Sequence, residues 1–471
     1  MTMNTQPPER VLYFGFRRPL NQEALRAALG RRRPTHVGLI SRSNFLGALA
    51  DEFVDAKHGF RSCTFATNTF RAFPSASFLQ RMQPRETVIL RMFERIFRGF
   101  QTGQDYELRK RLYLEQVAWA YGLLVDRGYQ EVIFSEIPHH PFPYILHSVA
   151  RELGLKARFF AQVQVKDTYV LAESIEEMFE PIRREYDRMR AQGEVEELGV
   201  RLQRERERRS GRHKPFYMGL SDLTWRRKLY QWTKKHLRAD DRLRLHRTLR
   251  NGWAYWRARR PLPAAQERFV YFPLHLQPEA TTSPMGGVFV DQYLAIEMMA
   301  RALPAGWKIV VKENPAQQLA KRDYGFYEQL AKMPQVHLVS RKASTFDLME
   351  RCEAVAAITG TAGWEALFKG KPVLVFGRAF YRGAPGTLTV SDVPSLSSGL
   401  QEIVEGRFHR CTASELDRFL GAIQRCSIEG VVDTQYLRDS EIAYDESVRR
   451  HTEVLADLLH GRAPGWLVKH A

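Results

Sequence analysis

Short apolar runs alternate with longer amphipathic stretches in the first part of the chain. Runs bounded by turn or polar residues are predicted to be strands: Val11–Phe16, His36–Ile40, Ser62–Phe65, Glu131–Ser135 and Ala157–Ala161. Helical patterns lie between them, including Gln22–Leu29 and Asp105–Arg127. This alternation is typical of a parallel sheet with helices on both faces.

The same alternation returns later in the chain. The later strands are predicted at Phe269–Phe272, Lys308–Lys312, His337–Val339, Ala354–Ile358 and Val373–Phe376. Helices are predicted between them at Gln292–Ala302, Tyr324–Lys332, Thr345–Cys352 and Gly363–Lys369. The pattern predicts a second doubly wound domain. Arg-rich helical segments separate the two regions, and residues 414–459 have a helical pattern.

A chain of 471 residues is too long for one ordinary core and suits two domains. We predict an α/β fold with two facing, doubly wound Rossmann-like domains, a basic helical insert and C-terminal helices. The predicted bounds are 9–173 for the first domain, 174–266 for the insert, 267–400 for the second domain and 401–471 for the C-terminal helices. Ligands of such folds bind in a cleft at the carboxyl ends of the strands.

The net charge of +18 is concentrated in one segment. Residues 201–260 hold 20 Lys and Arg against 5 Asp and Glu, so this segment supplies 15 of the 18 positive charges. It also contains six aromatic residues: Trp225, Tyr230, Trp232, Trp253, Tyr255 and Trp256. This composition suits an anionic membrane surface. Binding to a nucleic acid backbone and a simply solvated helical face are the alternatives.

Other features narrow the cellular setting. No run approaches the ~20 apolar residues that cross a bilayer, and the first residues lack the pattern of a secretory signal. The four cysteines are scattered, without metal-binding spacing: Cys63, Cys352, Cys411 and Cys426. We therefore expect reduced thiols and a cytoplasmic protein without structural zinc.

The segment 358–377, ITGTAGWEALFKGKPVLVFG, joins two predicted strands through a turn of small residues and a short helix that begins near Trp364. The turn contains Thr359, Gly360, Thr361 and Gly363. A helix start reached through such a turn suits a phosphate, and Glu365 could accept a sugar hydroxyl. The alternative is a tight connection without a ligand.

Polar residues also follow two other predicted strands of the second domain. FPLHLQPE contains His275, Gln277 and Glu279, and VVKENP contains Lys312, Glu313 and Asn314. A lysine at a strand end can neutralise a phosphate, although such residues can also merely meet solvent. Because three strands deliver polar or small residues to one edge of a sheet, we predict a binding site there.

In the first domain, the strand at 131–135 is followed by EIPHHPFPY. Its Glu136, His139 and His140 are candidate general bases or acids. The alternative is a proline-capped loop with the histidines packed on neighbouring aromatics. We expect no metal, because adjacent histidines point in different directions and no Asp-x-Asp pair lies near either predicted edge.

With these motifs in place, the chain resembles the bacterial capsule polysaccharide biosynthesis family, which includes Kdo-type glycosyltransferases. The matching segments are YFPLHLQPEATTSPMGG (271–287), VDQ (290–292), LPAGWKIVVKENP (303–315), ITGTAGWEALFKGKPVLVFG with AFY (358–381), and IFSEIPHHPFPYILHSVARELG (133–154). The resemblance covers most of 267–382 and a short part of the first domain.

The resemblance implies a GT-B-like glycosyltransferase that uses no metal and no cofactor beyond a nucleotide-sugar co-substrate. The donor would lie on the second domain and the acceptor on the first. Lys312 to Pro315 align with a Lys-Glu-His-Pro motif of the family, whose histidine would meet the phosphate; Asn314 replaces it here. Residues 359–363 would cradle the phosphate, and Glu365 would hold the ribose or the sugar.

We therefore expect a cytoplasmic enzyme, peripheral at the inner membrane, that transfers a sugar to a lipid-linked or glycan acceptor during capsule or surface polysaccharide synthesis. A CMP-activated, Kdo-like sugar is the expected donor, and nucleic acid is not an expected partner. Glu136, His139 or His140 would deprotonate the acceptor. The alternatives are a polyol-phosphate transferase, a nucleotide-sugar epimerase, or a non-catalytic scaffold that binds polyanions or membranes with a degenerate donor site.

Overall fold

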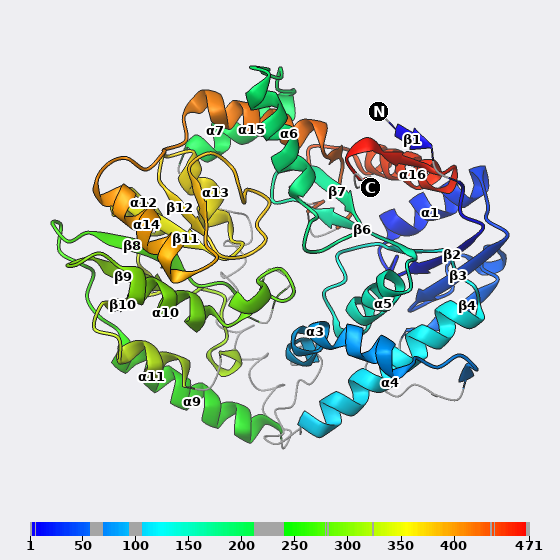
Figure 1. The fold of residues 1–471 in the computed structure, drawn as a ribbon, viewed down its shortest axis with the longest axis horizontal. Coiled ribbons are helices and arrows are strands. Elements are labelled where there is room, and N and C mark those ends of the chain that lie inside the picture. Colours follow the sequence, from blue (N-terminus) through cyan, green and yellow to red (C-terminus); the bar gives the residue numbers. More distant parts are fainter. Residues whose placement is uncertain are drawn as a thin grey trace, which may run out of the picture. The chain divides into compact units, whose positions relative to one another are not determined.

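The computed structural model describes residues 2–4, 6–56, 69–93, 106–211, 240–277, 279, 282–322, 325–433, 436–437 and 439–467 (Figure 1). These residues form two compact units. The first extends to Pro181 and resumes at Gln424, and the second is Ile182–Ile423. The predicted strand at 62–65 lies outside the described residues, as do Cys63, Trp225, Tyr230 and Trp232.

The first unit is built on a seven-stranded sheet in the order β14-β7-β6-β5-β2-β3-β4. Its strands are β2 (Arg10–Phe14), β3 (His36–Ser41), β4 (Glu52–Asp55), β5 (Glu131–Phe134), β6 (Lys156–Gln162), β7 (Thr168–Ala172) and β14 (Ile428–Glu429). The neighbouring strands β6, β5, β2, β3 and β4 are parallel. Strands β7 and β14 extend the sheet beyond β6 in antiparallel pairs. Four strands predicted from alternation, those at 11–16, 36–40, 131–135 and 157–161, are confirmed.

The helices and short elements of the first unit are α1 (Pro19–Arg31), η1 (Gly47–Leu49), α3 (Ala76–Met92), α4 (Tyr106–Asp126), α5 (Pro141–Glu152), α16 (Tyr444–Leu459) and η7 (Gly465–Leu467). The predicted helices at 22–29 and 105–127 correspond to α1 and α4. Helix α16 packs against α1, and strand β1 (Thr2–Asn4) pairs with β15 (Arg462–Pro464), so the two ends of the chain lie together (Figure 1).

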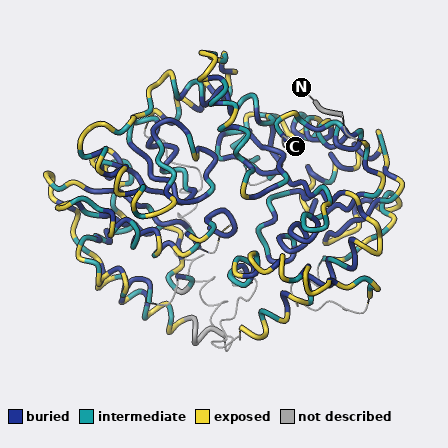
Figure 2. Tube along the Cα trace, in the orientation of Figure 1, coloured by how far each residue is buried: buried dark blue, intermediate teal, exposed yellow. Residues whose placement is uncertain are grey.

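The second unit has a six-stranded, fully parallel sheet in the order β10-β9-β8-β11-β12-β13. Its strands are β8 (Phe269–Pro273), β9 (Lys308–Lys312), β10 (Val336–Val339), β11 (Ala354–Ala357), β12 (Val373–Val375) and β13 (Thr387–Thr389). The central strands are continuous apolar runs because helices cover both faces of a parallel sheet, and they are buried in Figure 2. All five predicted strands of this region are confirmed.

The helices of the second unit are α6 (Glu180–Ala191), α7 (Val200–Ser210), α9 (Asp240–Ala258), η5 (Gly287–Val290), α10 (Gln292–Ala302), η6 (Leu319–Lys321), α11 (Phe326–Ala331), α12 (Thr345–Arg351), α13 (Thr361–Leu367), α14 (Val393–Val404) and α15 (Ala413–Arg425). Helix α13 begins at Thr361, earlier than the predicted start near Trp364, because the extended Gly360 already caps it. Every helix among the described residues is too short or too polar to cross a lipid bilayer.

The structural units divide the chain differently from the predicted bounds. Helices α7 and α9 of the predicted insert belong to the second unit, and the C-terminal helices separate, with most of α15 in the second unit and α16 in the first. A helical pattern in a sequence identifies an apolar face but not the surface that covers it. The two sheets confirm the predicted α/β class with two Rossmann-like domains.

Both sheets reverse their strand order beside their first strand. In the first unit the chain runs from β2 to β3 and β4 on one side and then returns to β5 on the other. In the second unit β8 lies between β9 and β11 in the same way. Open α/β sheets bind ligands at the carboxyl ends of the strands at such a switch point. The two candidate positions are therefore β2/β5 and β8/β11.

Candidate functional site

The three polar motifs of the second unit follow neighbouring strands. Strands β9, β8 and β11 are adjacent and parallel, so VVKENP, FPLHLQPE and ITGTAG all begin at one edge of the sheet. The N–H of Leu274 donates to the carbonyl of Lys312 at 2.9 Å and extends the pairing of β8 and β9 past the strand end. The topology thus brings the predicted residues to the switch point of this unit.

His275 joins the two strands of this switch point. Its Nε2 accepts a hydrogen bond from the N–H of Thr359 at 3.0 Å, and a Cβ on Gly360 would lie 2.9 Å from the same atom. The backbone of His275 exchanges two hydrogen bonds with the Gln292 amide, at 2.7 and 3.1 Å. Burial, aided by the charge of Arg322, lowers the pKa of His275 to about 4. The neutral imidazole therefore supports the glycine-threonine turn.

Glu313 and Gln277 belong to a buried network around Arg322. The Nη2 of Arg322 contacts Glu313 Oε1 at 2.6 Å, and its Nη1 donates to Gln277 Oε1 at 2.6 Å. The hydroxyl of Tyr327 donates to Glu313 Oε2, also at 2.6 Å. Both members of the ion pair are 0% exposed. A buried pair satisfied in this way holds loops in place, so Glu313 and Gln277 act as positioning residues.

The remaining residues of the two loops differ in exposure. The Lys312 ammonium donates to Thr345 Oγ1 at 2.6 Å, and burial lowers its pKa. Asn314 is half-buried, and its Oδ1 accepts the N–H of Ala316 at 2.9 Å. Glu279 is exposed. Solvent or a ligand therefore reaches Glu279 and Asn314 more readily than it reaches Lys312.

The turn of small residues is held from one side by Tyr381. Its hydroxyl donates to the carbonyl of Gly360 at 2.5 Å, and a Cβ on Gly363 would lie 2.4 Å from the same hydroxyl oxygen. The absence of a side chain at Gly363 therefore allows Tyr381 to pack, and Gly363 is buried within α13. Gly360 and Thr361 are half-buried and form the accessible part of the turn.

Glu365 is bound by a helix that lies far away in the sequence. Arg209 of α7 donates to Glu365 Oε1 at 2.9 Å and to Glu205 Oε1 at 2.8 Å. Burial raises the pKa of Glu365, and Arg209 opposes the shift. Burial would also raise the pKa of Glu205, but Arg209 and Arg208 together lower it. The indole N–H of Trp364 donates to Glu205 at 3.4 Å. The predicted basic insert thus contributes directly to the α13 region.

In the first unit, the three predicted residues lie in the loop between β5 and α5. Arg17 forms an ion pair of 2.6 Å with Glu136, and both side chains are partly exposed. His139 Nδ1 lies 2.8 Å from the carbonyl oxygen of Ile137, and its ring centroid lies 4.4 Å from that of His140. The loop follows β5 and therefore belongs to the switch point of this unit.

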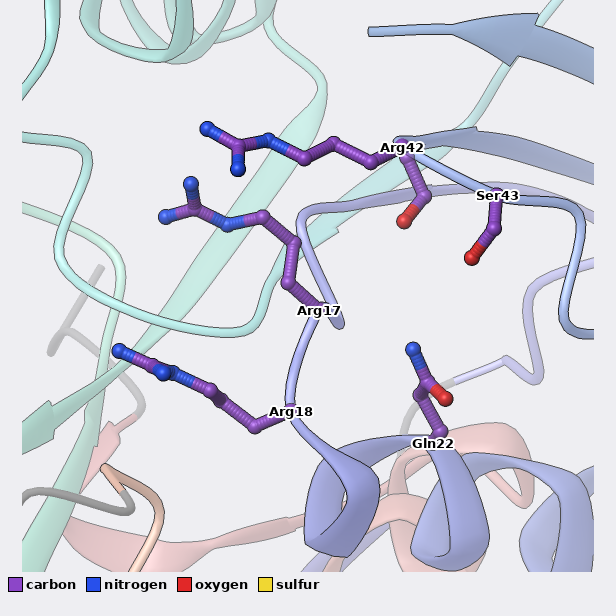
Figure 3. A pocket seen from close by; sticks show the side chains of 6 residues that line it. Arg17, Arg18, Gln22, Arg42 and Ser43 are labelled. Carbon is purple, nitrogen blue, oxygen red and sulfur yellow. The ribbon is translucent and has the colours of Figure 1, made fainter. Parts of the chain in front are cut away.

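A cationic cavity next to this loop was missed by the sequence analysis. Its volume is about 260 Å³, and its lining residues are Arg17, Arg18, Gln22, Ser41, Arg42 and Ser43 (Figure 3). The available signal was positional: RRPL follows the first predicted strand, and SRS follows the second. Arginines at the carboxyl ends of two neighbouring strands were the sign of a site for an anion.

Comparison with known proteins agrees with the motif resemblance. Residues 264–391 match the model of a protein family described as capsule polysaccharide biosynthesis protein. The matched region contains all three strand-end motifs and every strand of the second sheet. The predicted resemblance to the capsule polysaccharide biosynthesis family is therefore confirmed for this region.

A curated relative matches only part of the chain. The capsule polysaccharide modification protein LipA of Neisseria meningitidis serogroup B is 35% identical over 75 residues, which are 16% of this chain and 10% of LipA. The matched stretch thus spans about a tenth of the relative's length.

Similar solved structures are distant. The β-Kdo 2,7 transferase of Thermosulfurimonas dismutans KpsC has a TM-score of 0.31 at 13% identity, over 70% of this chain and 87% of the other. UDP-GlcNAc 2-epimerase from Neisseria meningitidis has a TM-score of 0.26 at 10% identity, over 95% and 98% of the two chains. TM-scores this low carry no functional argument.

Proposed function

We propose that this protein is a glycosyltransferase of capsule or surface polysaccharide synthesis. It transfers a sugar from a nucleotide donor, bound at the β8/β11 switch point, to a lipid-linked or glycan acceptor bound by the first unit. The observation that supports this proposal is the family match over 264–391, because the matched region contains the three motifs that meet at the switch point. We further propose a CMP-activated acidic sugar of the Kdo kind as the donor.

The proposed donor site uses a few groups on a rigid frame. His275, Gln277 and Glu313 fix the loops, while Lys312, Asn314 and the turn at 360–361 meet the donor. The Lys312 ammonium would stabilise the negative charge that develops on the leaving phosphate, an effect that is large in a site from which water is excluded. Glu365 would accept a hydroxyl of the ribose or the sugar.

The proposed general base, which would deprotonate the acceptor hydroxyl, lies in the β5–α5 loop of the first unit. Glu136 has a carboxylate at the switch point with a side chain that is 40% exposed, so an acceptor hydroxyl can reach it. His139 and His140 lie in the same loop and are the alternative bases. Removing the proton from the hydroxyl as the new bond forms is the role of a general base.

Two lysines of one strand provide a matched test. Lys312 ends β9 at the edge that holds the motifs, and Lys308 begins the same strand at the opposite edge. With CMP-, UDP- and GDP-sugars and a glycolipid acceptor, Lys312→Ala should lower kcat about 100-fold, as loss of one charge-stabilising donor does. Lys308→Ala should stay within about twofold.

Mass spectrometry of nucleotide release and of the product provides the readout, and thermal unfolding checks the fold of both variants. Equal activity of Lys312→Ala and Lys308→Ala would reject the site. Release of an epimerised sugar or a transferred polyol phosphate would replace the transferase reaction with one of those chemistries. Calorimetric silence toward CMP, UDP and GDP would reject the enzyme in favour of a scaffold.

We also propose that α9 holds the protein on the cytoplasmic face of the inner membrane. Leu245, Leu249, Trp253 and Trp256 are 42%, 64%, 57% and 68% exposed. At about 100° per residue they fall within about 80° of the helix circumference. The opposite face is buried through Ala254 and Ala258. An apolar stripe on an Arg-rich helix suits the interface of an anionic bilayer.

Sedimentation with phosphatidylglycerol vesicles tests this role. The double variant Leu249→Ala, Trp256→Ala should lose most of its binding, whereas Phe73→Ala should bind like the wild type. Phe73, in the first unit, is also 68% exposed and controls for loss of an exposed aromatic residue. Unchanged sedimentation of the double variant would contradict the proposal. Deleting 201–260 is a poorer test, because it removes the Arg209 contact with Glu365.

A further inference from the structure

The cationic cavity of the first unit is built by three neighbouring elements. Arg17 and Arg18 follow β2, Arg42 and Ser43 follow β3, and Gln22 lies in the first turns of α1. Figure 3 shows the three arginine side chains extending in the same direction from the two strand ends. A cavity of about 260 Å³ has room for a phosphate group and part of the molecule that carries it.

The backbone that carries Arg17 and Arg18 is fixed in an unusual conformation. Gly15 has φ +93° and the buried Phe16 has φ +39°, a region that residues with a side chain rarely adopt. The N–H of Phe16 donates to Ser135 Oγ at 2.9 Å, and the hydroxyl of Ser41 donates to the carbonyl of Gly15, also at 2.9 Å. These bonds hold the strained backbone in place, so the arginines leave the sheet at a defined position.

The side chains of this cavity suit an anion. Three guanidinium groups line it, and one of them, Arg17, pairs with the Glu136 carboxylate. Guanidinium groups also match phosphate oxygens in geometry, through paired parallel hydrogen bonds. The Gln22 amide and the Ser43 hydroxyl add neutral donors.

We propose that this cavity binds a phosphate group, as a phosphomonoester or a diphosphate. The cavity lies at the carboxyl ends of β2 and β3, and its Arg17 contacts Glu136 of the neighbouring loop. If the proposed function holds, on which this second step rests, the bound phosphate belongs to the acceptor and places its hydroxyl near Glu136. The acceptor is then a phosphorylated sugar or lipid rather than a neutral glycan.

Calorimetry with the full-length protein at low ionic strength tests the binding site itself. Pyrophosphate and inorganic phosphate should bind, and acetate should bind at least about tenfold more weakly. Arg18→Gln and Arg42→Gln should each weaken pyrophosphate binding about tenfold, as expected for loss of one charged hydrogen-bond donor. Arg31→Gln removes the same charge from the last turn of α1 and should change binding less than about twofold.

Equal binding of acetate and phosphate would overturn the proposal, as would unaltered binding in both arginine variants. The side chains of Arg18, Arg31 and Arg42 are exposed, so these substitutions leave the core intact. Two soluble fragments separate the sources of the phosphate group. Stronger binding of glucose 1-phosphate indicates a sugar phosphate, and stronger binding of glycerol 3-phosphate indicates a lipid headgroup.

A transfer assay tests the acceptor step separately. Arg18→Gln should raise the KM for a phosphorylated acceptor about tenfold and leave the KM for the nucleotide donor unchanged. An equal effect on phosphorylated and unphosphorylated acceptors would reject the acceptor role. Phosphate binding without any sugar transfer would reject the proposed function and leave the binding site standing. Transfer without phosphate binding would reject the binding site and leave the proposed function standing.

Discussion

The two switch points have the same strand connectivity, but their charged side chains differ in burial. At β8/β11 several charged and polar residues are buried and paired, as in the Glu313–Arg322 ion pair, in which both side chains are 0% exposed. At β2/β5 the charged residues reach solvent, as in the Arg17–Glu136 pair, with side chains 38% and 40% exposed. A buried pair fixes a frame, whereas an exposed cluster of one sign attracts a ligand.

This difference separates framework residues from contact residues within one motif. In VVKENP, Glu313 binds Arg322, while Asn314 is half-buried at the tip of the loop. A motif shared with a family therefore includes residues that shape the site and others that meet the ligand. Within this motif the buried ion pair identifies Glu313 as a framework residue, and the following predictions test the distinction.

The largest effect is expected from Arg322→Ala. It leaves the Glu313 carboxylate buried without its partner and should destabilise the second unit by about 3–5 kcal/mol. Urea unfolding followed by hydrogen exchange, which reports the two units separately, measures the loss. Arg18→Gln, an exposed arginine of the first unit, should change stability by less than about 0.5 kcal/mol. Similar losses in both variants would remove the distinction.

Acid should destabilise both units through buried histidines. Burial lowers the pKa of His275 in the second unit and of His147 in the first from 6.5 to about 4. The unfolded chain then binds more protons, so stability is complete above pH 6.5 and falls as the pH drops toward 4, by about 3 kcal/mol for each group.

His275→Gln should flatten this pH dependence in the second unit only. Glutamine offers an oxygen to the N–H of Thr359, which limits structural damage. Hydrogen exchange between pH 7 and about pH 4 measures the slope for each unit. An unchanged slope in the second unit would show that His275 is not the group that titrates.

Substitutions at two glycines test how tightly the turns at the two switch points are packed. Gly15→Ala and Gly363→Ala should each destabilise their own unit by about 1–3 kcal/mol, because the added Cβ would lie 2.5 Å from Ser135 Oγ and 2.4 Å from Tyr381 Oη respectively. The Gly15 substitution should cost more, since its φ of +93° adds backbone strain. Gly30→Ala, which meets nothing within 4 Å, is the control.

The smallest effect is expected from breaking the exposed ion pair. Arg17→Gln should change the stability of the first unit by less than about 1 kcal/mol, as exposed pairs do. Its effect on pyrophosphate binding should still reach about tenfold. Thermal unfolding and calorimetry on the same sample give both values. A large loss of stability would make Arg17 a framework residue and weaken the comparison.

Much of the fold and part of the candidate site followed from the sequence. Apolar runs predicted the central strands, and parallel topology predicted that residues after strands share an edge. The role of each residue at that edge did not follow from the sequence, because the burial of a side chain depends on partners that lie far away in the chain. Glu365 is bound by Arg209, 156 residues earlier in the chain, and no local pattern predicts that contact. Arg17 and Arg42 follow two predicted strands, but no glycine-threonine turn accompanies them in the sequence as one accompanies Lys312.

The first unit is assembled from the two ends of the chain. Strands β2 to β7 precede the second unit, whereas α16, which packs against α1, follows it. During synthesis from the N-terminus, the second unit therefore leaves the ribosome complete while α1 still lacks its partner. The arginine cavity begins at the start of this helix, so the cavity should form only after α16 has been synthesised.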